Sequence, residues 1–370
     1  MSKHVVTVVG AGNGGCTIAA DLSMKGHEVR LLKTSSTMHN KNFEIIQQQG
    51  GIYVERDEET TFAPISLITR DFRNAIHGSD IIYIVTQTLA HESLAPRLAP
   101  FFENGMVIML DPGYGGSLLF AKYSHAKKLI FAEGESLPLD CRIISDGKVK
   151  VLFENVRNPI GVFPSRLTQE GLNILADLYS NFTGISNVLE ATLHNPNLIV
   201  HTIGAIMNVS RIEYSNGEFW MYKEAFTPSI WNLVNMLDQE KMDILDKLDL
   251  PRISFLESFK FRTFKDLSGD SNRVFKYYAD EGSPKGPVSS KTRYITEDVP
   301  IGLGLMHSLG KKMGVKTPIC DALISIASAI NNEDYWRISR TLGTLGIDNL
   351  DSNKLKLFLE TGYSEYSNTN

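Results

Sequence analysis

Val5-Val6-Thr7-Val8-Val9-Gly10-Ala11-Gly12-Asn13-Gly14-Gly15 is the stretch that decides the fold of this chain. Its β-branched run stops at Gly10, and residues 16–25 then carry helical apolar spacing that ends at Gly26. Val29-Arg30-Leu31-Leu32 resumes a strand, so a strand, a glycine turn, a helix and a second strand follow one another within about 30 residues. This order predicts a βαβ unit, because parallel strands need a crossover helix between them.

The first half of the chain continues the same alternation. Further strand signals occur at residues 81–85, 106–110 and 128–131, separated by helix-compatible stretches such as residues 91–102. The region around residues 157–164 resembles a last sheet strand with turns. The alternation predicts an α/β fold with a Rossmann-type, doubly wound dinucleotide-binding domain.

From Thr168 onward the pattern becomes helical for the rest of the chain, with long amphipathic windows at residues 196–213, 228–248, 299–313 and 318–330. Residues 269–290 are rich in Gly, Ser, Pro and charge, and they predict a loop. We therefore expect two domains: a Rossmann dinucleotide-binding domain over residues 1–185 and an all-helical substrate domain over residues 186–370.

Composition sets further bounds on function. The 370 residues carry a formal net charge of −5, so no overall basic surplus predicts nucleic acid or an anionic membrane surface as a partner. Cys16, Cys141 and Cys320 lie far apart with no metal-type spacing, which predicts no metal site and favours a reducing, cytoplasmic compartment. We find no leader pattern and no membrane-length apolar run. A homodimer is left open.

The glycine turn carries the first piece of chemistry. Gly10 allows a tight turn, Gly12 lets the backbone approach a pyrophosphate, and Gly15 lets the helix pack close to the strand. The helix N-terminus, with Asn13 and Gly14, then offers amide groups and a positive dipole end to phosphates. A turn without a ligand is the structural alternative, but the flanking strand, helix and strand favour dinucleotide binding.

The end of the second strand bears on the choice of dinucleotide. A carboxylate there would bind the ribose 2′-hydroxyl of NAD, whereas this chain has Lys33 and Thr34 followed by two serines. A cation with hydroxyl neighbours can hold a 2′-phosphate, so the pattern favours NADP(H). If Lys33 is only a solvated strand-end residue, NAD(H) still fits.

The second candidate constellation begins at His194-Asn195-Pro196, where proline suits a first helical turn. On the helix that follows, Asn197, His201 and Asn208 are predicted to fall on nearly one face. A polar stripe among apolar residues needs buried partners or a function. A satisfied structural histidine is the alternative reading of His201.

The third constellation lies about 100 residues later. Arg293 can grip a carboxylate with a bidentate fork, and Asp298 stands just before a predicted helix near Pro300. Helix capping or a surface ion pair would explain both residues structurally. A carboxylate that accepts the N–H of a catalytic histidine is the functional reading.

Together these residues bring a family resemblance into view. The chain resembles the opine dehydrogenases of the octopine and nopaline type over nearly its whole length. The similarity is carried by Gly10 to Gly15, by Asp111-Pro112-Gly113-Tyr114-Gly115-Gly116, by the segment from Glu133 to Arg142, by Leu193-His194-Asn195-Pro196-Asn197 with His201, and by Arg293-Tyr294 through Asp298-Val299-Pro300.

The resemblance implies an NAD(P)H-dependent reductive condensation, in which the amine of an amino acid joins a 2-keto acid such as pyruvate. It also implies that His201 is the acid/base, Asp298 its partner and Arg293 the clamp on a substrate carboxylate. Ser136 stands where the family often has threonine near the keto acid. We expect substrate contacts from Ser136, Arg293 and the asparagines Asn197 and Asn208.

Two other functions stay open. A 2-keto acid reductase, or 2-hydroxy acid dehydrogenase, on the same fold would take no amine, but such enzymes commonly use a lysine base where this chain has His201. A non-catalytic NADP(H)-sensing protein would not need His201, Arg293 and Asp298 together.

Overall fold

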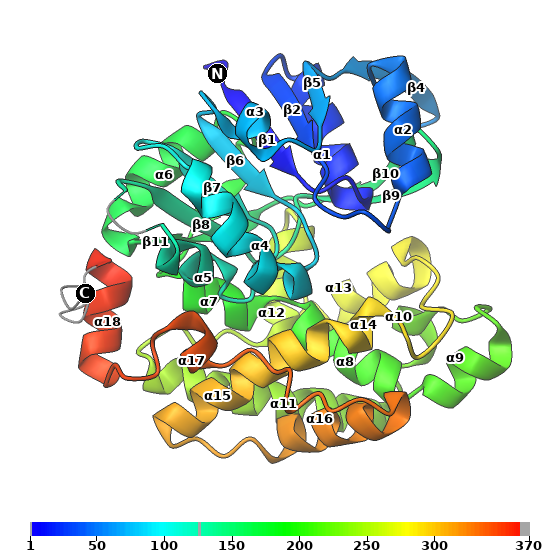
Figure 1. Ribbon diagram of the computed structural model, residues 1–370. Helices are drawn as coiled ribbons and strands as arrows, with labels where there is room; N and C mark the ends of the chain where they lie inside the picture. The colour runs from blue at the N-terminus through cyan, green and yellow to red at the C-terminus, as the bar shows by residue number, and fades with distance from the viewer. Residues whose placement is uncertain (1, 125–126, 363–370) are drawn as a thin grey trace. The chain divides into compact units, whose positions relative to one another are not determined.

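A computed structural model describes residues 2–124 and 127–362, which divide into two compact units (Figure 1). The first unit runs to Val188 and takes in a short segment from Leu359. The second unit runs from Leu189 to Phe358. The first unit is built on β-sheets and the second is helical, so the predicted fold class is confirmed.

The larger sheet of the first unit holds the predicted βαβ unit. Its strands in the described chain are β1 (Val5–Val9), β2 (Glu28–Leu32), β5 (Leu67–Thr69), β6 (Ile81–Ile84), β7 (Val107–Leu110), β8 (Ile130–Gly134), β11 (Asn158–Phe163) and β12 (Phe182–Gly184). They lie in the order β12-β11-β8-β7-β6-β1-β2-β5. Neighbouring strands are parallel except β11, which runs antiparallel to β8.

The centre of this sheet explains why its strands are continuous apolar runs. β1 pairs with β2 on one side and β6 on the other, and all four residues of β6 and of β7 are buried. A parallel strand covered on both faces needs apolar side chains in both directions, which the β-branched residues supply. The helices of this unit are α1 (Asn13–Met24), α2 (Asn40–Gln49), α3 (Phe72–Ile76), α4 (His91–Leu98), α5 (Gly116–Lys122) and α6 (Thr168–Leu175).

A second, smaller sheet was not predicted. Its strands are β3 (Gly51–Arg56), β4 (Glu59–Pro64), β9 (Leu139–Ser145) and β10 (Lys148–Glu154), in the order β4-β3-β10-β9. α1 packs against this sheet, so the strands of the smaller sheet cover α1 on the side away from β1. In β3, Ile52 and Val54 are buried while Tyr53 between them is exposed, which is the pattern of a sheet with one wet face.

The helical pattern predicted from Thr168 onward is present with three corrections, two of which fall in the second unit. Its helices are α7 (Val188–His194), α8 (Asn197–Ile206), α9 (Val209–Ser215), α10 (Met221–Glu224), α11 (Pro228–Lys247), α12 (Phe255–Thr263), α13 (Ser271–Tyr277), α14 (Arg293–Thr296), α15 (Gly304–Met313), α16 (Pro318–Asn331), α17 (Leu342–Leu345) and α18 (Ser352–Thr361). Two π-helical segments, Tyr278–Gly282 and Asp298–Leu303, complete it. α8, α11 and α16 pack on one another.

The corrections concern where helices begin and end. The prediction of a loop over residues 269–290 was wrong for α13 and for the π-helical turn after it. Asp270 caps α13, because its carboxylate accepts a hydrogen bond from the amide of Arg273. The predicted single helix over residues 196–213 is broken between α8 and α9. The short strand β12 interrupts the helical pattern that was expected to run on unbroken from Thr168. No helix in the described part of the chain is both long and apolar enough to cross a membrane.

Candidate functional site

The glycine turn between β1 and α1 has the geometry that a phosphate-binding turn needs. Gly10 has a φ of +116°, which favours glycine. A Cβ added at Gly15 would lie 1.8 Å from the carbonyl oxygen of Gly10, so any larger residue would push α1 off the turn. At Gly12 the nearest described atom to an added Cβ is His39 Cδ2, at 3.9 Å. Space is therefore open where a pyrophosphate would approach.

The first turn of α1 suits an anion in its electrostatics as well. α1 has no side-chain cap among the described residues and no acidic residue in its first turn, so its positive dipole end is not neutralised there. Asn13 has a structural task, because its Oδ1 accepts a hydrogen bond from the Ile143 amide at 2.8 Å. This bond fastens the glycine turn to β9 of the smaller sheet.

The residues after β2 form a cationic corner. Lys33 is buried, and its Nζ donates hydrogen bonds to Ser35 Oγ at 3.1 Å and to the Met38 carbonyl. Burial lowers the pKa of Lys33, and the nearby Arg70 guanidinium lowers it further. Lys33 therefore braces the loop after β2 rather than extending into solvent, while the half-buried Thr34 follows it.

Arg70 is a residue that sequence reasoning missed. It follows β5, which pairs in parallel with β2, so both strands deliver a cation to the same edge of the sheet. Arg70 is exposed, and it donates to the Ser35 carbonyl at 2.7 Å and to Asn40 Oδ1 at 3.0 Å. No local motif marks it, since only the β2–β5 pairing brings it beside Lys33. The open turn, the uncapped helix and these two cations fit a phosphorylated dinucleotide.

In the second unit, His201 and Asp298 form a buried pair. His201 Nδ1 and Asp298 Oδ2 lie 2.8 Å apart, with exposed side-chain fractions of only 4% and 1%. His201 comes from α8, and Asp298 opens the π-helical segment Asp298–Leu303 that packs against α8. With the carboxylate ionised, Nδ1–H donates to it, and Nε2 becomes the ring atom that accepts a proton. This arrangement supports acid/base chemistry at the imidazole.

α14 places two more side chains at this pair. The Tyr294 ring stacks on the His201 imidazole, with ring centroids 3.5 Å apart and planes 11° from parallel. The guanidinium carbon of Arg293 lies 5.5 Å from the centre of the same Tyr294 ring. Arg293 is exposed, so its guanidinium can meet a ligand while it contacts the ring that stacks on His201.

The predicted polar stripe on one helix was partly wrong. Asn197 and His201 lie four apart on α8, as expected, and Asn197 is half-buried. Asn208 lies beyond the end of α8, at the residue before α9, and its Nδ2 donates to the Gly204 carbonyl at 3.1 Å. Since α8 ends at Ile206 and this hydrogen bond ties the Asn208 side chain to the last turn of α8, Asn208 does not continue the helical face that carries His201.

Ser136 lies in the first unit, on the loop between β8 and β9. Asn155 Nδ2 donates to Ser136 Oγ at 3.2 Å and to the Leu137 carbonyl at 2.8 Å, and Asn158 Nδ2 donates to the Ser136 carbonyl at 3.0 Å. Sequence reasoning missed both asparagines, because β9 and β10 intervene between them and the loop they hold. The Asn155 amide therefore orients the Ser136 hydroxyl by donating to its oxygen, and the hydroxyl hydrogen can still donate to another group.

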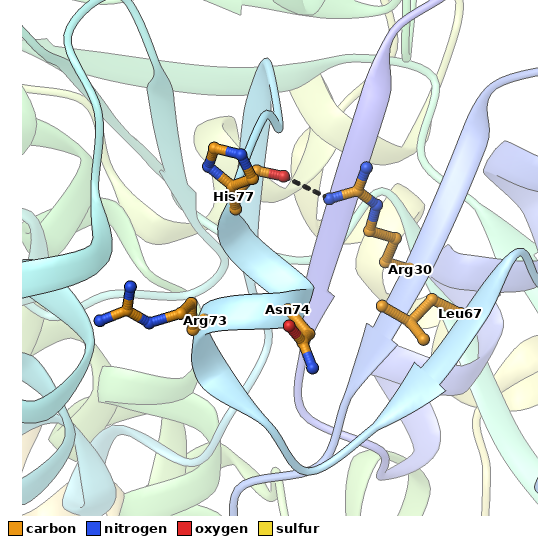
Figure 2. Close-up of a pocket in the computed structure, with 5 residues that line it drawn as sticks. All are labelled: Arg30, Leu67, Arg73, Asn74 and His77. Atoms are coloured by element: carbon orange, nitrogen blue, oxygen red, sulfur yellow. Dashed lines mark hydrogen bonds between the residues drawn. The ribbon is translucent and has the colours of Figure 1, made fainter.

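A separate hollow of about 430 Å³ lies on the first unit beside α3, and Figure 2 shows its lining residues, which are Arg30, Leu67, Arg73, Asn74 and His77. The Arg30 guanidinium donates to the carbonyls of Ala75 and His77 and to the Glu28 carboxylate. Arg73 points away from Arg30 in the same view (Figure 2). These cations do not converge, so the hollow is not a candidate anion site.

Comparison with known proteins connects both units to one family. A model of the alpha-helical domain of NAD/NADP octopine/nopaline dehydrogenases matches residues 184–331, and a model of ketopantoate reductase PanE/ApbA matches residues 6–132. The opine dehydrogenase of Arthrobacter sp. (strain 1C) is 30% identical over 369 residues, which cover 97% of this chain and 100% of that relative. This chain belongs to the opine dehydrogenase family.

Other relatives and solved structures agree with this membership. The vitopine synthase of Allorhizobium ampelinum is 26% identical to this chain, and the match covers 94% of this chain and 96% of the vitopine synthase. An octopine dehydrogenase structure with NADH and L-arginine superposes with a TM-score of 0.76 at 20% identity, covering 99% of this chain and 100% of that one. A yersinopine dehydrogenase with NADP⁺ bound has a TM-score of 0.70 at 13% identity, over 97% and 98% of the two chains. These structural likenesses confirm the fold.

Family membership settles the general chemistry. The opine dehydrogenases are NAD(H)- or NADP(H)-dependent oxidoreductases, and the chain is an enzyme of this type. The ketopantoate reductase model matches only the dinucleotide-binding part. The helical part, which carries His201, Arg293 and Asp298, is matched by the octopine/nopaline dehydrogenase model.

Proposed function

We propose that this protein condenses an amino acid with a 2-keto acid such as pyruvate and reduces the product to an N-(carboxyalkyl)amino acid, with NADPH as the preferred reductant. The observation that carries the proposal is the buried His201–Asp298 pair at 2.8 Å. It is supported by relatives that are named as opine, tauropine and octopine dehydrogenases. The first domain, residues 1–185, binds the dinucleotide, and residues 186–370 supply the acid/base.

His201 performs the proton transfers. Its Nε2 takes one proton from the substrate ammonium group, so that the neutral amine can attack the keto carbon and form a carbinolamine. The resulting imidazolium returns that proton to the departing hydroxyl, which leaves as water and gives a protonated imine. Asp298 stabilises the imidazolium between the two transfers and keeps Nδ1 as the donor to its carboxylate. When bound, NADPH supplies the hydride that reduces the imine carbon.

Both substrates carry carboxylates, which need placed donors in a chain of net charge −5. Arg293 supplies a planar fork that matches a carboxylate with two parallel hydrogen bonds. The Ser136 hydroxyl donates to the keto acid from the loop that Asn155 and Asn158 hold. Asn197, one helical turn before His201, contributes a further amide, and Asn208 supports the end of α8 instead.

The preference for NADP(H) rests on the cationic corner after β2. Lys33 and Arg70 lie where a carboxylate would otherwise select the ribose hydroxyls of NAD. Gly10, Gly12, Asn13, Gly14 and Gly15 hold the pyrophosphate at the start of α1. Thr34 lies next to this corner and adds a hydroxyl donor.

A cytoplasmic setting is proposed on the cysteines. Cys16, Cys141 and Cys320 are buried, and none forms a disulfide in the described part of the chain. Burial raises the pKa of the Cys16 thiol to about 12, so little of it is the reactive thiolate. These thiols fit a compartment in which disulfides do not form.

The deciding experiment follows oxidation of NADPH and of NADH with pyruvate alone and with pyruvate plus a panel of amino acids. We expect turnover only when an amino acid is present, with an N-(1-carboxyethyl)amino acid as the product by mass spectrometry. Turnover with a keto acid alone, giving a 2-hydroxy acid, would instead identify a 2-keto acid reductase. Binding of NADPH with no turnover on any substrate pair would identify a sensor.

A further inference from the structure

The Tyr294 and His201 rings stack face to face, at a separation shorter than aromatic pairs usually adopt. The two ring centroids are 3.5 Å apart and the ring planes differ by 11°. Aromatic pairs ordinarily prefer offset or edge-on arrangements with centroids 4.5–7 Å apart. Both side chains are buried, with 4% of His201 and 9% of Tyr294 exposed. Tyr294 therefore covers one whole face of the imidazole.

This contact restrains a motion that the carboxylate leaves free. The Asp298 hydrogen bond holds one ring atom, Nδ1, and a single contact of this kind does not by itself prevent a small tilt of the ring plane through the side-chain torsions. A second ring lying flat against the imidazole blocks that tilt on its side. Since Nε2 lies across the ring from the hydrogen bond, the tilt that Tyr294 blocks is the one that would move Nε2 out of line with a substrate.

The stack also acts on the charge of the imidazole. The face of a phenol ring carries partial negative charge and attracts a cation, and it attracts a neutral ring far less. The imidazolium that forms between the two proton transfers is therefore favoured over the neutral ring. Arg293 contacts the same phenol ring, so one aromatic side chain touches both the proposed acid/base and the proposed carboxylate clamp.

Other charged groups on the elements packed against α8 have identifiable partners or positions. Glu297 is buried next to Asp298 on the adjoining segment. On α11, Asp238 pairs with Lys241, and Glu240 accepts the amides of Ile319 and Cys320. The remaining groups on α11 are Asp243 and Asp246, which both contact Arg252, and the exposed Lys247. On the other elements they are Asp321 of α16, which pairs with His307; Glu224 of α10, which pairs with Arg211 of α9; the exposed Lys223 of α10; and the exposed Glu213 of α9. Of the residues of α14, Tyr294 contacts the His201 imidazole directly.

We propose that Tyr294 is a positioning residue for the opine-forming reaction: it holds the His201 imidazole in the plane set by Asp298 and favours its protonated form. This inference rests on the proposed function, because it assigns Tyr294 a task in that chemistry. Tyr294 itself exchanges no proton in this scheme. Its effect on the proton transfers passes through the His201 imidazole.

The kinetic test compares Tyr294→Leu with Tyr294→Phe across the pH range, in the direction of opine oxidation, where the neutral imidazole is the base. Loss of the aromatic face should lower kcat at least about tenfold and move the acidic limb of the pH profile down by about half a pH unit or more, because the imidazolium loses the partial negative charge of the phenol face. Tyr294→Phe keeps the ring and should recover most of kcat and the position of the limb. KM for the opine should change little in either variant.

Tyr335→Leu is the matched control, because Tyr335 is a buried tyrosine of the same unit that accepts from Asn331 rather than stacking on an imidazole. It should leave the acidic limb in place. If Tyr294→Leu keeps both the wild-type kcat and the wild-type limb, the proposal is wrong.

A second measurement needs neither activity nor a folded leucine variant. In the wild-type protein, the ring current of Tyr294 should move the His201 imidazole proton resonances upfield of those of an exposed histidine, with His201→Gln identifying the signal. Resonances at ordinary positions would overturn the stack and the proposal with it. If the upfield signals are present but His201→Gln retains full turnover, the proposed function fails while the stacking survives, so the two failures are distinguishable.

Discussion

His201 Nδ1 and Asp298 Oδ2 lie 2.8 Å apart although 97 residues separate them along the chain. α8 and the π-helical segment that begins at Asp298 pack against each other, and the buried His201 and Asp298 lie among buried apolar residues of both elements. A buried imidazole and a buried carboxylate are each costly alone, and they are tolerable as a hydrogen-bonded pair. The contact therefore specifies the geometry of the acid/base as well as joining two helical segments.

Removing the imidazole should abolish most turnover without affecting the dinucleotide. We expect His201→Ala to lower kcat by about 10²–10⁴-fold, the usual contribution of a positioned acid/base. The Kd for NADPH, measured by fluorescence titration, should stay within about twofold, because the glycine turn lies in the other structural unit. Loss of NADPH binding would contradict this assignment. Adding Asp298→Asn to His201→Ala should cost little more, since the pair acts as one group.

The cationic corner should govern discrimination between the two dinucleotides. Arg70→Glu should weaken NADPH binding by about tenfold or more, a change of about 1.4 kcal/mol, and leave NADH binding nearly unchanged, because only NADPH carries the 2′-phosphate. Lys33→Met keeps the length of the buried side chain and tests its charge separately. The measurement is the ratio of the two Kd values, and equal weakening of both cofactors would show that Arg70 does not contact the phosphate.

The planar fork of Arg293 should matter for substrate carboxylates. Arg293→Lys keeps the charge but loses the bidentate geometry, so we expect KM for pyruvate or the amino acid to rise about tenfold. Arg252→Lys, at an exposed arginine that pairs with Asp243, is the control and should leave KM unchanged. Unchanged steady-state constants for Arg293→Lys would remove Arg293 from the site.

Two glycines of the same turn should respond differently to alanine. An added Cβ at Gly15 would lie 1.8 Å from a backbone oxygen, whereas at Gly12 the nearest described atom is 3.9 Å away. Gly15→Ala should therefore lower the melting temperature of the protein. Gly12→Ala should keep that temperature and instead weaken dinucleotide binding. The prediction fails if Gly12→Ala binds NADPH as the wild type does.

His194 should make stability depend on pH. Burial, together with the nearby Lys241 cation, lowers the pKa of His194 to about 3. An unfolded histidine has a pKa near 6.5, so between about pH 6.5 and pH 3 the unfolded state binds more protons, and stability falls as the pH falls. The slope should approach about 1.4 kcal/mol per pH unit.

The check on His194 is denaturant unfolding of the wild type and of His194→Gln from pH 4 to pH 7, with the exposed His39→Gln as the control. The glutamine variant should lose most of this slope, because it has no titrating ring. An unaltered slope would mean that other groups set the acid sensitivity.

The sequence predicted those features that local chemistry determines. A β-branched run, three spaced glycines and a helical stretch can form only a tight turn at Gly10 and a close crossing at Gly15, and both are present. Likewise α11 and α16 begin at prolines, which suit a first helical turn, and they lie within two residues of their predicted bounds.

Local patterns failed where partners come from elsewhere in the chain. The smaller sheet joins β3 to β10 across some ninety residues (Tyr53 pairs with Lys148), and its half-exposed strands carry no continuous apolar run. The segment over residues 269–290 was predicted to be a loop, but it contains α13. The Phe275 ring of α13 packs against the Phe255 and Phe259 rings of α12, and the local composition gives no sign of this packing.

By itself, then, the sequence determined a Rossmann-type unit followed by helices, since glycine sterics and apolar periodicity act over a few residues. Only the tertiary structure gave the 2.8 Å separation of Asp298 Oδ2 from His201 Nδ1, laid Tyr294 flat against the same imidazole and brought Arg70 beside Lys33. Each of these contacts joins segments distant in sequence. Their distances and orientations depend on how helices and strands pack, which no spacing along the chain encodes.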